Sequence, residues 1–387
     1  RRVWKSEMQD NFGASSPYNA PAWLASLSPE VVPAQKLSLG RFPTPIHRFS
    51  IPNTEGFGLE CYIKRDDLSS FDLSGNKVRK LEFLLAEAKN SEKKYDCVIT
   101  VGGLQSNHAR ATAVAARQIG LVPFLILRKP EPTDEGSHTD ENIGLTGNLL
   151  FNRMVGADIR LISPSRYAAL GSHKVCEQLA EELRDQGRNP YIVPLGGSNA
   201  LGSFGYMQCV NEIIASGMHF DHIVFGCGSG GTAAGLALVV KLAGLTTQVH
   251  AVGVCDSPEY FYHHIAETAA ELGLTTDQLG PVEDLLHLYA GEGQGYARST
   301  DDELEFIIKV AQTTGIILDP VYSGKGLYHF VHKVLPDNAK KAAFLPGQKV
   351  LYIHTGGTVG LYDKEDQVVK LLPTNKVSRM KNYPGVK

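Results

Sequence analysis

The sequence predicts an α/β protein in which parallel-rich sheets are flanked by helices. Short apolar runs rich in Val, Ile and Leu alternate with segments of helical periodicity along most of the chain. The runs are apolar throughout, which is typical of strands buried on both faces, as they are in parallel sheets. At 387 residues, the chain is long enough for two domains or one large one.

Apolar runs bounded by Gly, Pro or charged residues are expected to form strands. These runs are residues 59–64, 97–103, 122–128, 158–162, 190–197, 222–228, 250–255 and 350–357. Segments that repeat apolar residues every three or four positions are expected to form helices. They are residues 77–90, 107–119, 143–155, 172–186, 205–216, 232–243 and 301–314. The first fifty residues, rich in Pro and Ser, are expected to form a covering arm.

The composition excludes several classes of function. A net charge of −3 and a pI near 6.5 argue against binding to nucleic acid or to a membrane surface. The six cysteines include no C-x-x-C pair and mostly lie in apolar runs, which predicts free buried thiols in a reducing compartment and no metal site. Residues 223–240 are the most membrane-like window, but their Gly-Ser interruption favours strand, loop and helix.

The sequence shows no secretory signal pattern, and it begins at Arg1 rather than at a methionine. A processed organellar end therefore stays open, and we expect a cytoplasmic or mitochondrial location.

Glycine and small polar residues follow several of the expected strands, in "VGGLQSNH", "PLGGSN", "GCGSGGT" and "HTGGT". Parallel sheets bind ligands at the carboxyl ends of their strands, and glycine allows the backbone to approach a ligand closely. The stretch at residues 226–235 enters from a strand and leaves into a helix, so its N–H groups would point at an anion. The expected phosphate cup consists of Gly228, Ser229, Gly230, Gly231 and Thr232.

Two other interpretations of this stretch are possible. Gly226, Gly228 and Gly231 have the spacing of a dinucleotide-binding fingerprint, but residues 243–253 lack the acidic residue expected about twenty positions later. A glycine-rich tight turn without a ligand is the second alternative. We favour a cup for a cofactor the size of a mononucleotide.

A lysine lies just inside an expected helix start in "SGNK", after a strand that ends in a burst of charge. Gly75 and Asn76 could simply cap this helix and leave Lys77 in solvent. Together with the cup and the small polar loops, however, Lys77 suits pyridoxal phosphate. That cofactor needs a lysine for its Schiff base, a dipolar cup for its phosphate and a group that faces its ring nitrogen.

With these residues, the chain resembles the family of D-cysteine desulfhydrases and 1-aminocyclopropane-1-carboxylate deaminases. These are fold-type II enzymes that use pyridoxal 5'-phosphate and are related to the tryptophan synthase β chain. The resemblance runs from "FPTPIHRF" at residue 42 to "HTGGTVGLYDK" at residue 354, and it is strongest to the plant-type desulfhydrases. Its motifs are "IKRDDLSSFDLSGNKVRKLEFLLAEA", "GGLQSNHARATAVAA", "GNLLFNRMVGA", "PLGGSNALGSFGY", "GCGSGGTAAG", "LDPVYSGKGLY" and "HTGG".

The resemblance implies roles for individual residues. Lys77 would carry the cofactor, Ser106 would handle the substrate, and Asn107 would hydrogen-bond the ring hydroxyl. Tyr296 and Tyr322 match two active-site tyrosines of the family.

Two neighbouring residues have less certain roles. His108 stands where the family often has a histidine, although it could equally cap its helix. Lys80 is expected to make a surface or interdomain contact.

Two further positions divide the family. Deaminases resemble "VYEGK", with a glutamate against the pyridine nitrogen, and "HLGG", whereas this chain has Ser323 and Thr355. Both residues match the desulfhydrases. A carboxylate on the ring nitrogen makes the cofactor a strong electron sink, which ring opening requires more than β-elimination does.

The implied reaction is β-elimination of D-cysteine to pyruvate, hydrogen sulfide and ammonia. The alternatives are deamination of 1-aminocyclopropane-1-carboxylate and elimination from a related β-substituted D-alanine. An oxidoreductase built on "GCGSGGT" is less favoured, because the acidic residue is missing and "SGNK" stays unexplained. A catalytically silent regulator is less favoured, because the chain retains Lys77 and both tyrosines.

The family also suggests a homodimer of two-domain chains. We expect a small domain, residues 83–194, inserted into a large cofactor-binding domain of residues 1–82 and 195–387. Glycine-rich loops on both sides of the cleft suggest that the small domain could close over the substrate.

Overall fold

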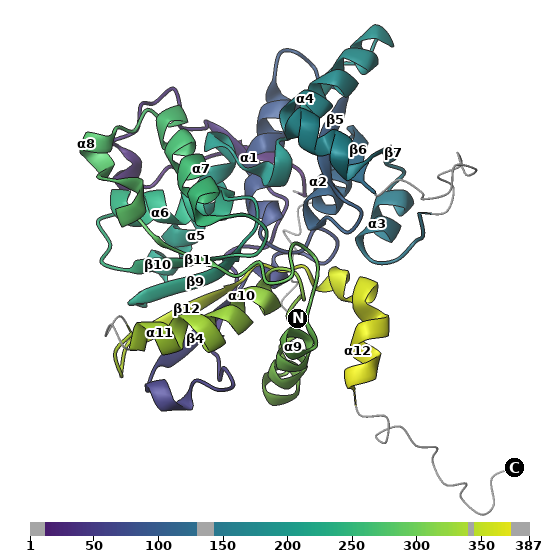
Figure 1. Cartoon of the computed structure of the whole chain (residues 1–387). Coiled ribbons are helices and arrows are strands. Elements are labelled where there is room, and N and C mark those ends of the chain that lie inside the picture. Colours follow the sequence, from purple (N-terminus) through teal and green to yellow (C-terminus); the bar gives the residue numbers. More distant parts are fainter. Residues whose placement is uncertain (1–11, 130–142, 340–343, 373–387) are drawn as a thin grey trace, which may run out of the picture.

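The computed structural model describes residues 12–129, 143–339 and 344–372. Its strands form two large sheets and one small antiparallel pair, and helices lie on both faces of each large sheet (Figure 1). This architecture confirms the predicted α/β class.

The larger sheet has the strand order β11-β10-β9-β12-β4-β3. Neighbouring strands run parallel except at the edge, where β3 pairs antiparallel with β4. The strands are β3 (Ile46–Arg48), β4 (Glu60–Arg65), β9 (His222–Cys227), β10 (Gln248–Gly253), β11 (His287–Ala290) and β12 (Lys349–His354).

Separate hydrophobic clusters cover the two faces of this sheet. One contains Phe204, Leu238 and Phe261 from helices α5, α6 and α7, and the other contains Leu304 and Leu327 from α9 and α10. The helices around this sheet are α5 (Ala200–Ala215), α6 (Gly231–Leu242), α7 (Pro258–Glu271), α8 (Thr276–Leu279), α9 (Asp301–Thr314), α10 (Ser323–His329), α11 (Leu335–Ala339) and α12 (Glu365–Leu371).

The smaller sheet has the order β7-β6-β5-β8, and all of its strands run parallel. Helices α1, α2 and α3 pack on one face and α4 on the other. The elements are β5 (Cys97–Gly103), β6 (Val122–Arg128), β7 (Asp158–Ile162), β8 (Pro190–Ile192), α1 (Lys77–Asn90), α2 (Asn107–Gln118), α3 (Asn148–Met154) and α4 (Pro164–Asp185). All four strands lie within the range expected for the small domain; the domain boundaries themselves stay a prediction.

The described part of the N-terminal segment contains the small antiparallel pair, β1 (Ser15–Pro17) and β2 (Gln35–Leu37), and β2 packs on α1. Leu24 and Leu37 of this segment are buried. Helix α10 is followed directly by a π-helical turn, Phe330–Val334. The structure also contains short 3-10 helices at Ala22–Leu24, Glu55–Phe57, Asp66–Leu68, Leu195–Gly197, Val282–Asp284 and Thr358–Lys364.

Helix α1 is held in place by a buried ion-pair network. The guanidinium of Arg79 donates through Nε and Nη2 to the carboxylate of Asp66, at 2.8 Å each, and through Nη1 to Glu212 at 2.8 Å. Lys64 of β4 also donates to Glu212, at 2.8 Å. These bonds tie the start of α1, and therefore Lys77, to β4 and α5.

Most predicted elements lie where the sequence placed them, and the differences have local causes. Helices α1 and α9 have the predicted bounds. Helix α4 spans Pro164–Asp185 but is broken at Gly171, whose backbone is non-helical at φ 78; its second part follows this residue, where the sequence predicts a helix over 172–186, and only the part before Gly171 was not predicted. Strand β8 stops at Ile192, since Gly196 and Gly197 take positive φ values of 69 and 60 and form a turn.

Several further elements differ from the prediction. Helix α3 begins at residue 148 rather than 143, and helix α5 begins at residue 200 rather than 205. The elements that were not predicted are β1, β2, β3, α7, α8, β11, α10, α11 and α12.

The window of residues 223–240 forms strand β9, a loop and helix α6, as predicted. Within the described ranges, no helix is both long and apolar enough to cross a membrane. All six cysteines are free; four are buried, while Cys61 and Cys255 are half-buried.

Candidate active site

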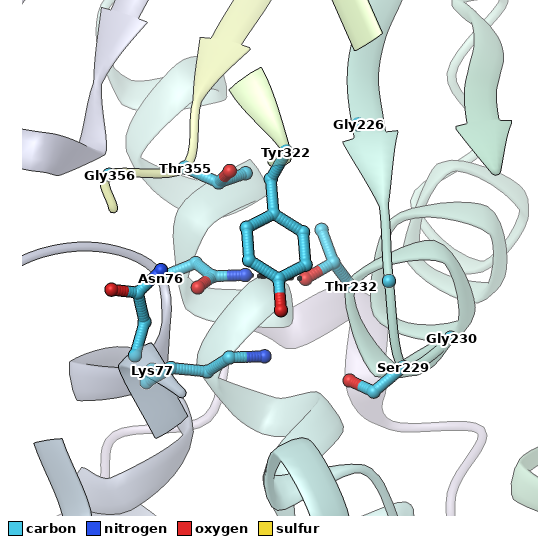
Figure 2. A pocket seen from close by; sticks show the side chains of 11 residues that line it. Asn76, Lys77, Gly226, Ser229, Gly230, Thr232, Tyr322, Thr355 and Gly356 are labelled. Carbon is cyan, nitrogen blue, oxygen red and sulfur yellow. Dashed lines mark hydrogen bonds between the residues drawn. The ribbon is translucent and has the colours of Figure 1, made fainter. Parts of the chain in front are cut away.

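The loops that follow β5, β9 and β12 meet where helices α1, α2 and α6 begin, at the carboxyl ends of the strands, as expected. They surround an inner pocket, shown in Figure 2. Its lining residues are Asn76, Lys77, Asn107, Gly226, Gly228, Ser229, Gly230, Thr232, Tyr322, Thr355 and Gly356.

An outer chamber adjoins the inner pocket and shares Lys77, Gly228, Ser229 and Tyr322 with it. Its other lining residues come from both large sheets and their helices: Gly102, Gly103, Ser106, His108, Arg128, Tyr167, Leu195, Gly196, Cys255, Asp256, Tyr260 and Tyr296. The two cavities together could hold a flat ring and a small substrate beside it.

Lys77 is the first residue of α1, and its side chain points into the inner pocket (Figure 2). Its Nζ lies 3.4 Å from the carbonyl oxygen of Gly196. Burial lowers the pKa of Lys77 to about 8, so an appreciable share of its amine is neutral near pH 7. Lys77 is half-buried and lines both cavities, which argues against the alternative of a solvated first-turn lysine, and a neutral amine there is suited to nucleophilic attack on a carbonyl.

Lys80 lies beside the same site, so of the two contacts expected from sequence, surface or interdomain, the surface one is wrong. It is fully buried, and its Nζ donates to the carbonyl of Gly196 at 3.1 Å and to Oγ of Ser198 at 3.3 Å. Burial, and then the charge of Lys77, lower the pKa of Lys80 well below its usual value. The two lysines are three positions apart and therefore share one face of the helix.

The residues of the predicted cup lie at the junction of β9 and α6. Gly230 has φ 81, and a Cβ on Gly228 would lie 2.7 Å from Cε1 of Tyr322, so both positions favour glycine. Oγ of Ser229 lies 2.8 Å from Oγ of Ser198, and Oγ1 of Thr232 accepts a hydrogen bond from Asn76 at 3.1 Å. The free N–H groups at the start of α6 favour an anion here.

One predicted member of the cup lies behind it. Gly231 begins α6 and does not line either pocket. A Cβ at Gly231 would come within 2.7 Å of Nζ of Lys80, which places this amine directly behind the cup.

Ser106 and Asn107 lie at the start of α2. Ser106 is the N-cap, since its Oγ accepts from the N–H of Ala109 at 3.1 Å, and it also lines the outer chamber. Oδ1 of Asn107 is buried without a hydrogen-bond partner among the described residues. An orphaned acceptor of this kind costs about 1–3 kcal/mol, so the site is built for a ligand that donates to it.

His108 is not a helix cap, because Ser106 takes that role. Its Nε2 lies 2.8 Å from Oγ1 of Thr100, which itself donates to the carbonyl of Val193 at 2.8 Å. Thr100 has only one proton, so Nε2 of His108 must be the donor. Burial, and then the charge of Lys77, hold the pKa of His108 well below its usual value, and the imidazole is neutral.

Tyr296 and Tyr322 form a hydrogen-bonded pair at the boundary between the two cavities. Their hydroxyl oxygens lie 2.7 Å apart. Burial raises the pKa of both phenols, that of Tyr322 the more strongly. Both hydroxyls therefore stay protonated at neutral pH and can act as proton donors.

The two positions that divide the family lie differently. Thr355 follows β12 and lines the inner pocket (Figure 2). Ser323 is fully buried behind Tyr322 and is not among the lining residues. Its Oγ lies 2.5 Å from Oδ1 of Asp319, a buried carboxylate that the sequence analysis did not single out.

Other residues of the site were also missed from sequence, among them Asn76, Ser198 and Arg128. Asn76 lies in the quoted "SGNK" motif, where its polar side chain was a usable signal. Arg128 ends β6, so the rule that ligands bind at strand carboxyl ends could have found it.

Comparison with known proteins decides the family. Residues 37–356 match the family described as pyridoxal-phosphate dependent enzyme. This chain belongs to that family. The resemblance seen in the sequence is thereby confirmed, together with its fold type and its cofactor.

Individual relatives are similar over most of their length. The chain is 44% identical over 368 residues to the mitochondrial bifunctional D-cysteine desulfhydrase/1-aminocyclopropane-1-carboxylate deaminase of Arabidopsis thaliana, covering 94% of this chain and 87% of that one. It is 36% identical to a D-cysteine desulfhydrase of Serratia proteamaculans, covering 86% and 97%. The crystal structure of an ACC deaminase homologue matches with a TM-score of 0.74 and 35% identity, covering 91% and 98%.

The residues present fit pyridoxal phosphate. Lys77 offers a buried amine of lowered pKa, and the cup before α6, with Lys80 behind it, suits the phosphate. The orphaned oxygen of Asn107 can accept a hydrogen from the ring hydroxyl. Gly228 leaves the space beside Tyr322 that a side chain would fill.

Proposed function

We propose that this enzyme catalyses the β-elimination of D-cysteine, with one water consumed, to pyruvate, hydrogen sulfide and ammonia. The observation that carries the proposal is the Tyr296–Tyr322 pair, whose hydroxyls lie 2.7 Å apart in the chamber that also contains Lys77. A base and a proton donor in one small cavity are what elimination of a sulfur leaving group requires. The names of the Arabidopsis and Serratia relatives support this choice of substrate.

Lys77 has the properties of the base that takes the α proton. Bound pyridoxal phosphate supplies an electron sink that stabilises negative charge on the substrate's α carbon. Because burial lowers the pKa of Lys77 to about 8, its amine can accept a proton near neutral pH.

The tyrosine pair supplies the proton for the departing sulfur. One hydroxyl of the pair donates to the other, and the hydroxyl that accepts still has its own hydrogen to give. The raised pKa values of Tyr296 and Tyr322 keep this hydrogen in place at neutral pH. Proton transfer to sulfur lowers the barrier to breaking the Cβ–S bond.

Residues at the starts of helices α2 and α6 bind the cofactor and orient the substrate. The N–H groups and hydroxyls of residues 228–232, with Lys80 behind them, hold the phosphate, and Asn107 holds the ring. Ser106 lies in the outer chamber, where its hydroxyl can orient the substrate carboxylate. Fixing these groups aligns the Cα–H bond for transfer to Lys77.

A second candidate is deamination of 1-aminocyclopropane-1-carboxylate to 2-oxobutyrate and ammonia. The observation that favours it is the Asp319 carboxylate, 2.5 Å from Oγ of Ser323. The Arabidopsis relative is named for both activities. Elimination from another β-substituted D-alanine would use the same residues.

The test is a side-by-side turnover assay of purified protein with added pyridoxal phosphate. D-cysteine, L-cysteine and 1-aminocyclopropane-1-carboxylate are offered separately, and sulfide, pyruvate and 2-oxobutyrate are quantified. We expect equal amounts of sulfide and pyruvate from D-cysteine, lost in Lys77→Ala and retained in Lys174→Ala, a substitution of an exposed lysine on α4. Dominant 2-oxobutyrate would favour the second candidate, and turnover of L-cysteine alone would contradict the assigned stereochemistry.

Assembly and location are proposed on the resemblance. The protein acts as a homodimer whose small domain, residues 83–194, closes over the substrate. It works in the mitochondrion or the cytoplasm, and the mitochondrial name of the Arabidopsis relative favours the former.

A further inference from the structure

We propose that Lys325 is a positioning residue: its ammonium group holds the loop of residues 291–300 and so places the hydroxyl of Tyr296 against that of Tyr322. The inference rests on the proposed function, in which this tyrosine pair protonates the departing sulfur. It gives a role to a buried lysine that lines neither of the two cavities.

The loop that carries Tyr296 connects strand β11 to helix α9 and contains no helix or strand of its own. Among the described residues, the backbone-to-backbone hydrogen bonds of residues 292–298 stay within the loop. Ala297 has a left-handed backbone at φ 59, which L side chains rarely adopt, and Lys364 donates to its carbonyl at 2.8 Å. The position of Tyr296 therefore depends on side chains that reach this loop from elsewhere in the chain.

Lys325 makes three such contacts from helix α10. Its Nζ donates to the carbonyl oxygens of Glu292, Gly295 and Arg298 at 2.9, 3.2 and 2.6 Å. An ammonium group has three hydrogens, so all three of them point at the loop. A neutral amine has only two, so the three carbonyls are satisfied together only by the charged form.

The charge of Lys325 is compensated inside the protein. Oε2 of Glu303 lies 3.7 Å from Nζ of Lys325, and both side chains are buried. Burial lowers the pKa of Lys325, and the charge of Glu303 opposes this shift. Because Nζ is closer to each of the three carbonyls than to the carboxylate, its hydrogens hold the loop and Glu303 balances the charge.

The start of one helix thereby places both tyrosines. Tyr322 is the N-cap of α10, and Lys325 lies three residues later. Helix α10 thus carries Tyr322 and also holds the loop with Tyr296, and the two hydroxyl oxygens lie 2.7 Å apart. A shift of about 1 Å between catalytic groups can lower a rate by about a hundredfold, so loss of this hold should be visible in turnover.

The first test measures the hold on the loop directly, by limited trypsin digestion of the loaded enzyme. Arg298 is exposed, and cleavage after it needs the carbonyl to which Lys325 donates. Lys325→Met keeps most of the side chain but has no hydrogen to donate. We expect this variant to speed cleavage after Arg298 by about tenfold or more, while cleavage after the exposed Lys94, in the turn before β5, keeps its rate.

The second test compares two leaving groups. Sulfide leaves more readily when it receives a proton, whereas chloride needs none, so elimination from 3-chloro-D-alanine does not depend on the placement of Tyr296. In Lys325→Met the turnover number with D-cysteine should fall by about tenfold to a hundredfold, and that with 3-chloro-D-alanine should not change. Lys89→Met is the matched control: Lys89 donates to the carbonyl of Gly13 at 2.8 Å near the end of α1, and its replacement should change neither turnover number.

Two further variants keep the test decisive if Lys325→Met does not fold. The double variant Lys325→Met/Glu303→Gln removes both buried charges and so leaves none unpaired. Lys364→Met removes only the contact with Ala297. Both variants should lose turnover of D-cysteine and keep that of 3-chloro-D-alanine, and the loss should be smaller in Lys364→Met.

Several outcomes would overturn the proposal. Equal acceleration of cleavage after Arg298 and Lys94, or equal losses with the two substrates, would indicate a general loss of structure. An unchanged turnover of D-cysteine in Lys325→Met would mean that Lys325 does not place Tyr296. A wild type that releases no sulfide from D-cysteine would contradict the proposed function, and the cleavage rates would still decide whether Lys325 holds the loop.

Discussion

Replacement of Asp66 by alanine is expected to lower the free energy of unfolding by about 3–5 kcal/mol, the usual cost of removing one partner of a buried ion pair. Asp66 is fully buried and accepts two bonds of 2.8 Å from Arg79 and one of 2.8 Å from Thr44. Without it, the guanidinium of Arg79, itself 1% exposed, keeps Glu212 as its carboxylate partner. The cost comes mainly from this incompletely compensated charge.

The assay is urea unfolding followed by tryptophan fluorescence, with Glu60→Ala as the matched control. Glu60 pairs with Arg48 at 3.4 Å, but their side chains are 39% and 75% exposed, so its loss should cost no more than about 1 kcal/mol. The double variant Asp66→Ala/Arg79→Met removes both charges and should be more stable than Asp66→Ala alone. Glu212 would still pair with Lys64.

Two results would refute this reasoning. A loss below about 1 kcal/mol in Asp66→Ala would mean that the network does not anchor α1. A double variant less stable than the single one would mean that lost packing, and not the unpaired charge, causes the effect.

Three further predictions concern the site and the sheet. The rate at which the cofactor-free enzyme takes up pyridoxal phosphate should rise with pH and level off above about 8. The reason is that burial lowers the pKa of Lys77 to about 8 and only the neutral amine reacts. A rate that does not change between about pH 6 and 9 would contradict this. Gly228→Ala should weaken pyridoxal phosphate binding by at least about tenfold in a fluorescence titration, because its Cβ would lie 2.7 Å from Tyr322, whereas Gly56→Ala, with open space around it, should not. Burial lowers the pKa of His222 and, more strongly, of His250, so the folded state binds fewer protons than the unfolded state. The free energy of unfolding should therefore be at its full value above the unfolded pKa of about 6.5 and fall as the pH drops below it. The fall should be shallower in His250→Gln, and an equal slope in the wild type and the variant would contradict the assignment.

The elements that sequence predicted well carry their signals locally. Helix α9 begins at a capping box between Thr300 and Glu303, and apolar residues then repeat at helical spacing. Strands β5 and β6 are continuous apolar runs, as expected for parallel strands covered on both faces. The fold class followed from these local patterns.

The missed elements differ in how much local signal they carry. Strand β11 has only four residues, at the sheet edge, and His287 interrupts its apolar stretch, so its pairing with β10 defines it. Helix α7 does carry local signals: Ser257 caps it, a proline stands in its first turn, and the buried Phe261, Ile265 and Ala269 are spaced four residues apart. Helix α7 could therefore have been predicted from sequence.

The site was predicted where motifs are contiguous and missed where the fold assembles it. Lys77 and the cup at 228–232 stand in short glycine-containing stretches with a recognisable chemistry. In the sequence, Asp319 precedes a proline and is typical of a turn residue. Only the folded chain shows that its carboxylate contacts Ser323. Lys80 could have been found, because residues three apart on a helix share a face.

The central claim is that Lys77 carries the cofactor. The most direct measurement is to reduce the loaded enzyme with borohydride, which fixes the cofactor to its lysine, and to map the labelled peptide by mass spectrometry. The account predicts a single phosphopyridoxyl group on Lys77, absent from Lys77→Ala. A label on Lys80, whose amine shares the carbonyl of Gly196 with that of Lys77, or on no lysine at all, would contradict it.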